Sequence, residues 1–295
     1  MISEILIGGA VITGVYSLYK YEVDSIEKTE YIIENSKIPK EFDDFNIVQI
    51  SDLHNKSFGK NNAKLLNYID ELRPDIIVIT GDLVDSENRK FKVALDLIDN
   101  LIKKYKVYHI IGNHEQKSLI KKYRELYITY FKELYSKKII NLEDRYIKIE
   151  KGNSSINIYG LIIPLDYYPY FFSNYKNKNL KLDKKFIENV LGQVNKNDYN
   201  ILLAHTPFFI DKYSKWGADL VLSGHVHGGI IRLPFVGGVL SPNREFFPEY
   251  DFGKYVVKDT TMLLSKGLGG SKVLVRINCR PEIVKITLRN KSNES

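Results

Sequence analysis

The sequence predicts an α/β protein with one large domain, and three observations support this prediction. Short apolar runs rich in β-branched residues alternate with segments whose apolar residues recur at helical spacing. These runs end at polar motifs, as strands do where loops begin at the carboxyl edge of an α/β sheet. The chain of 295 residues is long enough for one full core. It contains neither an internal repeat of fixed period nor a low-complexity segment, which favours a single domain.

The first half of the chain predicts three strands that alternate with three helices. The predicted strands are residues 45–51 (FNIVQIS), 75–80 (DIIVIT) and 107–111 (VYHII). The predicted helices are residues 61–72, 90–105 and 114–135. Arg73 and Pro74 end the first helix, because proline cannot continue one. Residues 21–43 are mostly polar and lack strong periodicity, which predicts a linker before the first strand.

The second half repeats this alternation and then changes character. Residues 155–163, 199–205 and 218–225 are predicted strands, and residues 184–194 are a predicted helix. Three short runs separated by glycine turns follow, and they are typical of an antiparallel sheet. These runs are residues 253–259, 261–267 and 281–288.

The composition limits the chemistry. A single cysteine, Cys279, excludes a disulfide framework within the chain and a cysteine-rich zinc site. A metal ion would therefore be held by His, Asp, Glu or Asn. The net charge is +7, and because residues 1–40 carry −2, the remainder carries +9. The basic residues are scattered, which favours solvated helix faces over a nucleic-acid interface, although a phosphorylated substrate or an anionic membrane surface also fits the excess.

Residues 5–19 (ILIGGAVITGVYSLY) carry the membrane signal of the sequence. These 15 uncharged residues fall short of the roughly 20 that span a bilayer. No basic segment, twin arginine or cleavage site accompanies them, which argues against a removed signal peptide. We expect a short anchor or an interfacial helix, and the alternative is a helix packed on the core. Lys20 and Lys28, on the C-terminal side, favour a body on the cytoplasmic side of the membrane.

Five of the six histidines lie in short motifs at predicted strand ends, beside Asp, Asn or Gly. The motif residues are Asp52 and His54 in DLH, Asp82 in GDLVD, Asn113 and His114 in GNHE, His205 in LLAH, and His225 and His227 in GHVH. Because strand ends meet at one edge of a sheet, we expect these residues to converge. Alternate residues at a strand end point the same way, so Asp52 and His54 are expected to bind one ion together. Asp85 is expected to cap a turn or to support a ligand, and His109, inside VYHII, to lie in the core.

In their order, these motifs resemble those of the calcineurin-like metallophosphoesterases, which are D-x-H, G-D-x-x-D, G-N-H-[ED], H and G-H-x-H. The resemblance extends from about residue 44 to residue 290. It implies a four-layer α/β sandwich, in which two mixed β-sheets are flanked by helices. The chain would then comprise a hydrophobic N-terminal segment (residues 1–20), a linker (residues 21–43) and a phosphoesterase domain (residues 44–290).

The resemblance also implies a site for two divalent metal ions. The ligands of the first ion would be Asp52, His54, Asp82 and His227. The ligands of the second ion would be Asp82, Asn113, His205 and His225. His114 would be the catalytic histidine, near the substrate and not on a metal. Two cations about 3.5–4 Å apart neutralise phosphoryl oxygens and lower the pKa of bound water. Ligation by His, Asp and Asn fits Mn²⁺, Fe or Zn²⁺ and disfavours Ca²⁺.

The sequence after GHVH is similar to a bacterial branch that includes membrane-associated phosphoesterases and a UDP-2,3-diacylglucosamine hydrolase. Members of this branch commonly carry an N-terminal hydrophobic segment, and they usually have glutamine where this chain has Ile230, a difference that concerns substrate contacts. The aromatic segment 164–175 is expected to cover the core, to form an apolar wall beside the metals for an acyl chain, or to contact lipid. Asp166 and Arg276 are candidates for substrate contact.

We therefore expect a metal-dependent phosphoesterase that hydrolyses a phosphodiester or pyrophosphate bond, of a lipid or nucleotide-sugar substrate near the membrane. A nuclease or nucleotide phosphodiesterase of the same superfamily is one alternative, motivated by the basic body. Such nucleases usually add a capping domain that reads DNA, and the sequence leaves no segment for one. A metal-stabilised scaffold without activity is the other alternative, but degenerate members normally lose ligands, and all seven are present here.

Overall fold

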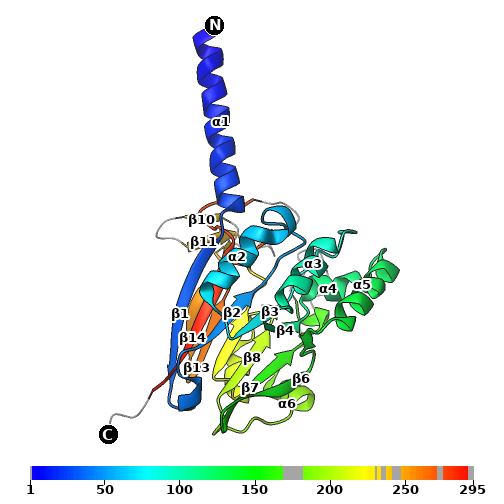
Figure 1. Ribbon diagram of the computed structural model, residues 1–295, viewed down its shortest axis with the longest axis vertical. Helices are drawn as coiled ribbons and strands as arrows, with labels where there is room; N and C mark the ends of the chain where they lie inside the picture. The colour runs from blue at the N-terminus through cyan, green and yellow to red at the C-terminus, as the bar shows by residue number, and fades with distance from the viewer. Residues whose placement is uncertain are drawn as a thin grey trace.

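The chain folds into four layers, from which the first helix projects (Figure 1). The computed structural model describes residues 2–168, 182–229, 231–233, 237–240, 247–270 and 275–291. Two mixed six-stranded sheets pack against each other, and helices cover the outer face of each sheet. This arrangement confirms the predicted four-layer α/β sandwich with two mixed sheets flanked by helices.

The first sheet supplies three of the predicted motif loops. Its strands are, in spatial order, β1 (Glu27–Asn35), β14 (Glu282–Asn290), β2 (Phe45–Ile50), β3 (Ile76–Thr80), β4 (Lys106–Ile110) and β5 (Ile140–Asn141). Strands β2 to β5 run parallel, β14 runs antiparallel to β2, and β1 runs parallel to β14. The motifs that follow β2, β3 and β4 therefore share one edge of the sheet, which we call the carboxyl edge.

The second sheet supplies the remaining two motif loops. Its strands are, in spatial order, β12 (Gly253–Val257), β13 (Thr260–Leu264), β9 (Leu220–Ser223), β8 (Asn200–Ala204), β7 (Ser154–Leu161) and β6 (Arg145–Lys151). The four central strands run parallel, and the strands at both edges are antiparallel to their neighbours. A separate antiparallel hairpin consists of β10 (Ile231–Leu233) and β11 (Gly237–Leu240).

Three apolar cores hold the layers together. One lies between the first sheet and α2 (Ala63–Leu72), α3 (Lys92–Leu101) and α5 (Arg124–Ser136). The second lies between the two sheets, and the third lies between the second sheet and α6 (Lys184–Leu191) and α7 (Ile210–Trp216). Both faces of the central parallel strands are thus buried, which accounts for their continuous apolar sequence. The short elements are α4 (Asn113–Ser118), η1 (Lys40–Phe42), η2 (Lys60–Asn62), η3 (Leu165–Tyr167) and η4 (His227–Gly229).

Residues 21–43 do not form the predicted linker. The chain is helical up to Asp24, and residues 27–35 form β1, which pairs with the last strand of the chain along its whole length. Phe42 and Ile38 are fully buried under the first sheet. The sequence pattern missed β1 because an edge strand needs few buried positions, and in β1 only Ile33 is buried. Residues 26–43 therefore belong to the folded body, and Val23 is buried as well.

Two further elements differ from their predictions. The helix predicted over residues 114–135 is divided into α4 and α5, with turns over residues 119–123. The three runs predicted as one antiparallel sheet belong to two sheets, because β12 and β13 join the second sheet and β14 joins the first. Pairing between strands that are distant in sequence decides this division, and local periodicity does not record it.

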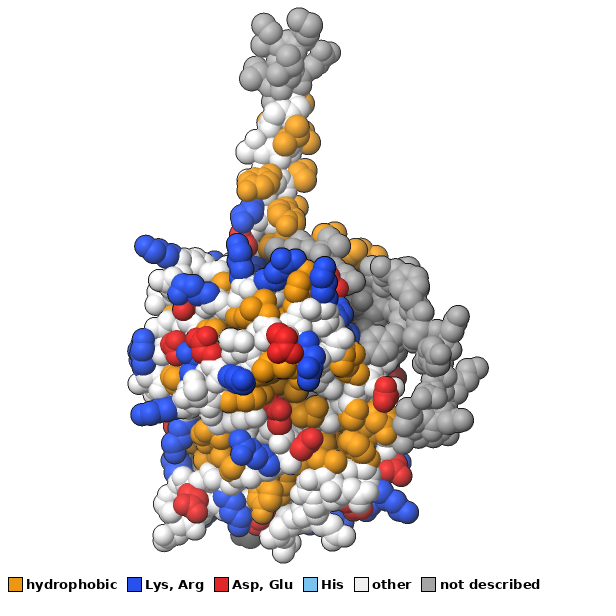
Figure 2. All heavy atoms as spheres, turned by 90° about the vertical axis from the view of Figure 1, so that its right-hand side faces the viewer, with side chains coloured by type: hydrophobic (Ala, Val, Ile, Leu, Met, Phe, Trp, Pro, Cys, Tyr) orange, Lys and Arg blue, Asp and Glu red, His pale blue; other side chains and the backbone are white. Residues whose placement is uncertain are grey.

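Helix α1 (Ile2–Asp24) projects from the body, with basic side chains on the end of the body beneath it (Figures 1 and 2). Its large apolar side chains are exposed, at 71% for Ile12 and 64% for Val15, so α1 is not the core-packed helix that was the alternative. Among the described residues, no helix combines the length and apolar character needed to cross a membrane.

Helix α1 projects from the carboxyl edge. Because α1 ends at Asp24 and β1 begins at Glu27, the amino end of β1 lies at the foot of α1, which we define as residues 20–24. Glu282 at the start of β14 pairs with Glu27, and β2 is antiparallel to β14. The carboxyl end of β2, and with it the DLH motif, therefore lies at the foot of α1.

Candidate metal centre

The predicted site residues lie on loops at the carboxyl edge, contributed by both sheets. Each loop follows a buried strand: Asp52 and His54 follow β2, Asp82 follows β3, Asn113 and His114 follow β4, His205 follows β8, and His225 and His227 follow β9. Backbone hydrogen bonds hold the first two loops together, since the Asp52 N–H donates to the carbonyl of Gly81 and the His54 N–H to that of Asp82, both at 3.0 Å. The structure brings all eight residues into one cluster, in which His114 is partly exposed and the other seven are buried.

Five of these residues have left-handed backbone conformations. The φ angles lie between 49° and 77° at Asp52, His54, Asp82, His225 and His227. Such a conformation costs of order 1–3 kcal/mol for a residue with a Cβ, and it concentrates at functional sites. Strand alternation therefore does not orient Asp52 and His54 as the sequence predicted, because β2 already ends at Ile50. The turns after the strand direct both side chains into the same cluster.

The first group of possible ligands comprises Asp52, His54 and His227, whose ligand atoms all lie within 4.8 Å of one another. Nε2 of His54 lies 3.3 Å from Nε2 of His227, and Nε2 of His227 lies 3.5 Å from Oδ1 of Asp52. Ligand atoms bound to one ion at about 2.1 Å stand roughly 3–3.5 Å apart. The spacing therefore fits a shared cation.

The second group comprises Asp82, His205 and His225, also within 4.8 Å of one another. Nε2 of His205 lies 3.2 Å from Oδ2 of Asp82 and 3.1 Å from Oδ1 of Asn113. Nδ1 of His205 lies 2.7 Å from the Thr80 carbonyl, and a proton held there leaves the lone pair of Nε2 free for a metal. The predicted ligands of the second ion are thus together.

The two groups are adjacent, and Asp82 lies between them. Oδ2 of Asp82 is 3.7 Å from Nε2 of His54 in the first group and 3.2 Å from Nε2 of His205 in the second. Oδ1 of Asp52 is 4.0 Å from Nε2 of His205. One carboxylate therefore reaches ligands of both groups, as a residue that bridges two cations must.

The buried carboxylates of the cluster also indicate that the site binds cations. Burial raises the pKa of Asp52. Burial acts in the same direction on Asp82, but His205 and His114 hold its pKa well below the ordinary range. Burial opposes the charged form of His205, yet the adjacent Asp82 carboxylate raises its pKa to about 9. Two buried carboxylates need compensating positive charge, and the donor set of carboxylate, imidazole and amide groups suits divalent metals.

His114 lies at the more open side of the cluster and is supported by Asp85. The backbone N–H of Ser86 donates to Nδ1 of His114 over 3.3 Å, so the neutral ring carries its proton on Nε2. Oδ2 of Asp85 lies 3.6 Å from the same Nδ1. Burial lowers the pKa of His114 to about 4. One atom each of His54, Asp82 and His114 also lie within 4.8 Å of one another, so geometry alone does not exclude His114 as a ligand.

Glu115 supports the site, and the sequence reasoning did not single it out. Its Oε2 accepts the backbone N–H groups of Gly112 and Asp82, each at 2.9 Å, and its Oε1 accepts that of Val84 at 3.2 Å. Burial raises the pKa of this carboxyl to about 8. Glu115 thereby joins the loop after β3 to the loop after β4, and its position in GNHE was the available signal.

Two glycines allow the loops to approach one another. A Cβ at Gly112 would collide with the carboxylate of Asp82, and a Cβ at Gly224 would collide with Asp52 and Ser51. The backbone N–H of His225 donates to both carboxylate oxygens of Asp52 at 3.1 Å. The absence of a side chain at these two positions is therefore required for the spacing of the carboxylates.

The remaining predicted contacts have different outcomes. In the aromatic segment, the Tyr168 ring packs edge-on against the His225 ring, with 5.1 Å between the ring centroids. Phe208, outside this segment, also packs edge-on against His225, with 5.8 Å between the centroids. Asp166 is exposed in η3. Arg276 does not face a substrate site, because it is buried and its guanidinium donates to carbonyls of Lys266, Gly267, Gly269 and Cys279. Ile230 and residues 169–175 lie outside the described residues.

His109 is buried in β4, in the core as predicted. Neither of its ring nitrogens has a hydrogen-bond partner within the described part of the chain. Burial lowers its pKa to about 3, so the ring is neutral.

Comparisons with known proteins agree with this geometry. A family model described as calcineurin-like phosphoesterase matches residues 45–229. The chain is 29% identical over 300 residues to YkuE of Bacillus subtilis, an uncharacterized metallophosphoesterase, and the match covers 98% of this chain and 95% of YkuE. It is 28% identical to an uncharacterized metallophosphoesterase of Aquifex aeolicus, with 96% and 99% covered.

A Danio rerio protein named as a transmembrane protein with a metallophosphoesterase domain is 26% identical, with 95% of this chain and 61% of that protein covered. Among solved structures, phosphopantetheinyl hydrolase (PptH) of Mycobacterium tuberculosis matches with a TM-score of 0.46 at 13% identity, and the match covers 80% of this chain and 96% of PptH.

Proposed function

This chain belongs to the calcineurin-like phosphoesterase family of metal-dependent hydrolases, and we propose on that premise that it uses two divalent metal ions to hydrolyse a phosphodiester or pyrophosphate bond. The observation that carries the proposal is the position of Asp82 between two groups of possible ligands. A single structural ion would not need two adjacent groups joined by one carboxylate. When bound, such a pair of ions neutralises the phosphoryl oxygens and activates water.

In this proposal, the position of each residue determines which metal ion it would bind. Asp52, His54 and His227 would hold the first ion, Asn113, His205 and His225 would hold the second, and Asp82 would contribute to both. The left-handed turns and the backbone donors to Asp52 fix these side chains before substrate binds. Mn²⁺, Fe and Zn²⁺ are the ions that the donor set fits best.

His114 is the residue that we assign to the substrate. Its Nδ1 is occupied by the Ser86 N–H and faces Asp85, so its Nε2 proton is available to a phosphoryl oxygen or to the leaving oxygen. Asp85 orients the ring and would stabilise its charged form if the phosphate raised its pKa. A positioned donor or acid of this kind contributes about 10²–10⁴-fold to the rate.

We further propose that the substrate is a lipid or a nucleotide sugar at a bacterial membrane, with the body on the cytoplasmic side. The exposed apolar residues of α1 support membrane association, and Lys20 at its C-terminal end supports this orientation. The aromatic rings of Tyr168 and Phe208 beside His225 supply an apolar contact for the group that carries the phosphate. The relative from Danio rerio is named as a transmembrane protein, which agrees with this proposal.

The test of the proposed chemistry is hydrolysis of bis-p-nitrophenyl phosphate by the purified chain, loaded in turn with Mn²⁺, Zn²⁺ and Fe²⁺. We expect turnover that a chelator removes and that Asp82→Ala abolishes. Asp96→Ala, which removes a carboxylate from the helix α3 far from the motif loops, is the matched control and should retain full activity. Absence of turnover with every divalent metal would contradict the proposal.

A further inference from the structure

An apolar patch lies beside the foot of α1 and has no role in the metal centre. It consists of Leu233, Phe247 and Ile277, which are exposed at 49%, 62% and 45% and which we call the hairpin patch. Backbone hydrogen bonds hold its three segments together: the Phe247 N–H donates to the Val239 carbonyl at 3.1 Å, and the Arg232 N–H to the Ile277 carbonyl at 3.0 Å. The three segments that carry these exposed side chains are therefore joined to one another.

The hairpin patch is continuous with α1. The segment that carries Ile277 also contains Cys279, whose backbone N–H donates to Oε2 of Glu22 on α1 at 3.3 Å. Arg280, in the same segment, donates to the Tyr21 hydroxyl at 3.0 Å, and its guanidinium lies over the Tyr21 ring. Figure 1 accordingly shows β10 and β11 beside the lower end of α1. A partner that surrounds α1 would thus meet the hairpin patch.

The uncharged surface of α1 identifies the kind of partner. Between residues 5 and 19 the helix has no charged side chain, so it presents no charged face to water. Ile12, Val15 and Tyr16 occupy one side, whereas Ala10, Gly14 and Ser17 occupy the other. Acyl chains can surround such a helix over its whole circumference. The 15 residues extend about 22 Å, which is less than the roughly 30 Å of a hydrocarbon core.

Charge at this end of the body fits anionic lipid headgroups. Lys20 at the foot of α1 is half-exposed, and Lys64 and Arg280 contact the foot through Asp24 and Tyr21. Figure 2 shows basic side chains across the end of the body from which the apolar helix rises. Basic residues at the boundary between an apolar anchor and a soluble body attract anionic lipids.

The hairpin patch and the foot of α1 both lie next to loops that carry predicted metal ligands. The hairpin follows η4, which begins at the predicted ligand His227. Lys56, two residues after His54, donates to the Val23 carbonyl at the foot of α1. We infer that the hairpin patch and α1 together dock on an anionic bilayer, so that the carboxyl edge faces the lipid and the substrate is a phosphoester in a lipid headgroup. This inference rests on the proposed function for its substrate class, whereas the docking surface does not depend on it.

The first experiment measures docking without catalysis. The full chain is sedimented with vesicles of phosphatidylcholine alone and with vesicles that also contain phosphatidylglycerol. We expect binding that is stronger to the anionic vesicles and that falls at least about tenfold in the double variant Leu233→Asp/Phe247→Asp. Val256→Asp, at a 61% exposed position on β12, is the matched control and should bind like the unmodified chain. Circular dichroism checks that the variants are folded.

Three outcomes overturn the docking surface. They are binding that the double variant leaves unchanged, an equal loss in the Val256→Asp control, and assembly of copies through α1 without vesicle binding. The second experiment compares hydrolysis of phospholipid headgroups in the bound vesicles with hydrolysis of bis-p-nitrophenyl phosphate. Cleavage of the soluble ester alone overturns the lipid substrate class. Cleavage of neither overturns the proposed function, while patch-dependent vesicle binding would still support the docking surface.

Discussion

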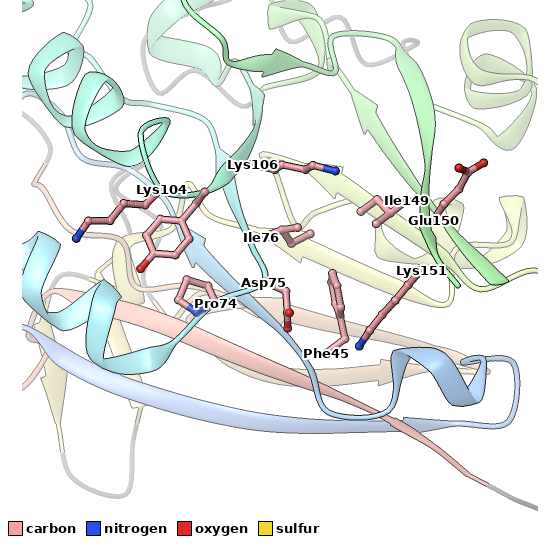
Figure 3. A pocket seen from close by; sticks show the side chains of 10 residues that line it. Phe45, Pro74, Asp75, Ile76, Lys104, Lys106, Ile149, Glu150 and Lys151 are labelled. Carbon is pink, nitrogen blue, oxygen red and sulfur yellow. The ribbon is translucent and has the colours of Figure 1, made fainter. Parts of the chain in front are cut away.

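The metal centre at the carboxyl edge and a groove at the opposite edge place charged groups in opposite environments. At the carboxyl edge, Asp52 and Asp82 are buried among imidazole rings. At the opposite, amino edge, a groove of about 410 Å³ lies over Phe45, Ile76 and Ile149, and its charged residues are exposed at the rim (Figure 3). These rim residues are Asp75, Lys104, Lys106, Glu150 and Lys151.

This difference separates charges that the fold must compensate from charges that water solvates. A buried ion costs several kcal/mol unless it is paired, so evolution has little reason to keep one without a function. The carboxyl edge carries the buried carboxylates of Asp52 and Asp82, five left-handed residues among the predicted ligands, and the glycines that admit close approach. The exposed charges at the rim of the groove need no such support, and we expect them to be dispensable.

The largest effect is expected at His114. His114→Gln removes the donor assigned to the substrate, so kcat should fall by about 10²–10⁴-fold. Metal content, measured after dialysis by elemental analysis, should stay unchanged because His114 is not assigned as a ligand. Loss of metal in this variant would instead make His114 a ligand, as its distances to His54 and Asp82 permit.

A smaller effect is expected at Glu115, which supports the backbone of the ligand loops and is not itself assigned as a ligand. Glu115→Gln replaces one acceptor oxygen by an amide that cannot accept the N–H groups of Gly112, Asp82 and Val84 equally well. Because supporting groups of this kind affect metal affinity by about 10–100-fold, the variant should need more Mn²⁺ for half-maximal activity. Recovery of full activity at saturating Mn²⁺ would separate this positioning role from a catalytic one.

His109 tests whether a buried titratable group outside the site affects stability alone. Burial holds its pKa near 3, below the unfolded value of about 6.5. The unfolded chain therefore binds more protons between these values, and stability falls as the pH drops through this window, by up to about 1.4 kcal/mol per unit. His109→Leu should flatten the loss between pH 7 and pH 5 in urea unfolding of the metal-free chain. An unchanged pH dependence would show that the ring does not titrate on unfolding.

The smallest effect is expected at the amino edge. Lys106→Gln removes an exposed charge from the rim of the groove, and substitutions at such surfaces usually change stability by less than about 0.5 kcal/mol. Activity on bis-p-nitrophenyl phosphate should equal that of the unmodified chain. A severalfold loss of activity would remove the contrast between the two edges.

Much of the architecture could be predicted from local sequence, because buried parallel strands read as apolar runs and their ends carry the polar motifs. The pairing of residues 27–35 with β14 could not, since it joins the two ends of the chain. The left-handed turns at Asp52 and His54 also left no periodicity to read. Arg276 was misassigned because a buried arginine that holds loop carbonyls and an arginine that binds phosphate have the same sequence signal.

The number of metal ions per chain tests the central claim most directly. After loading with Mn²⁺ and dialysis, elemental analysis should find two ions per chain. His227→Ala and His205→Ala each remove one ligand from a different group, so each variant should retain about one ion. Fewer than two ions in the unmodified chain, or the loss of neither ion in both variants, would contradict the account.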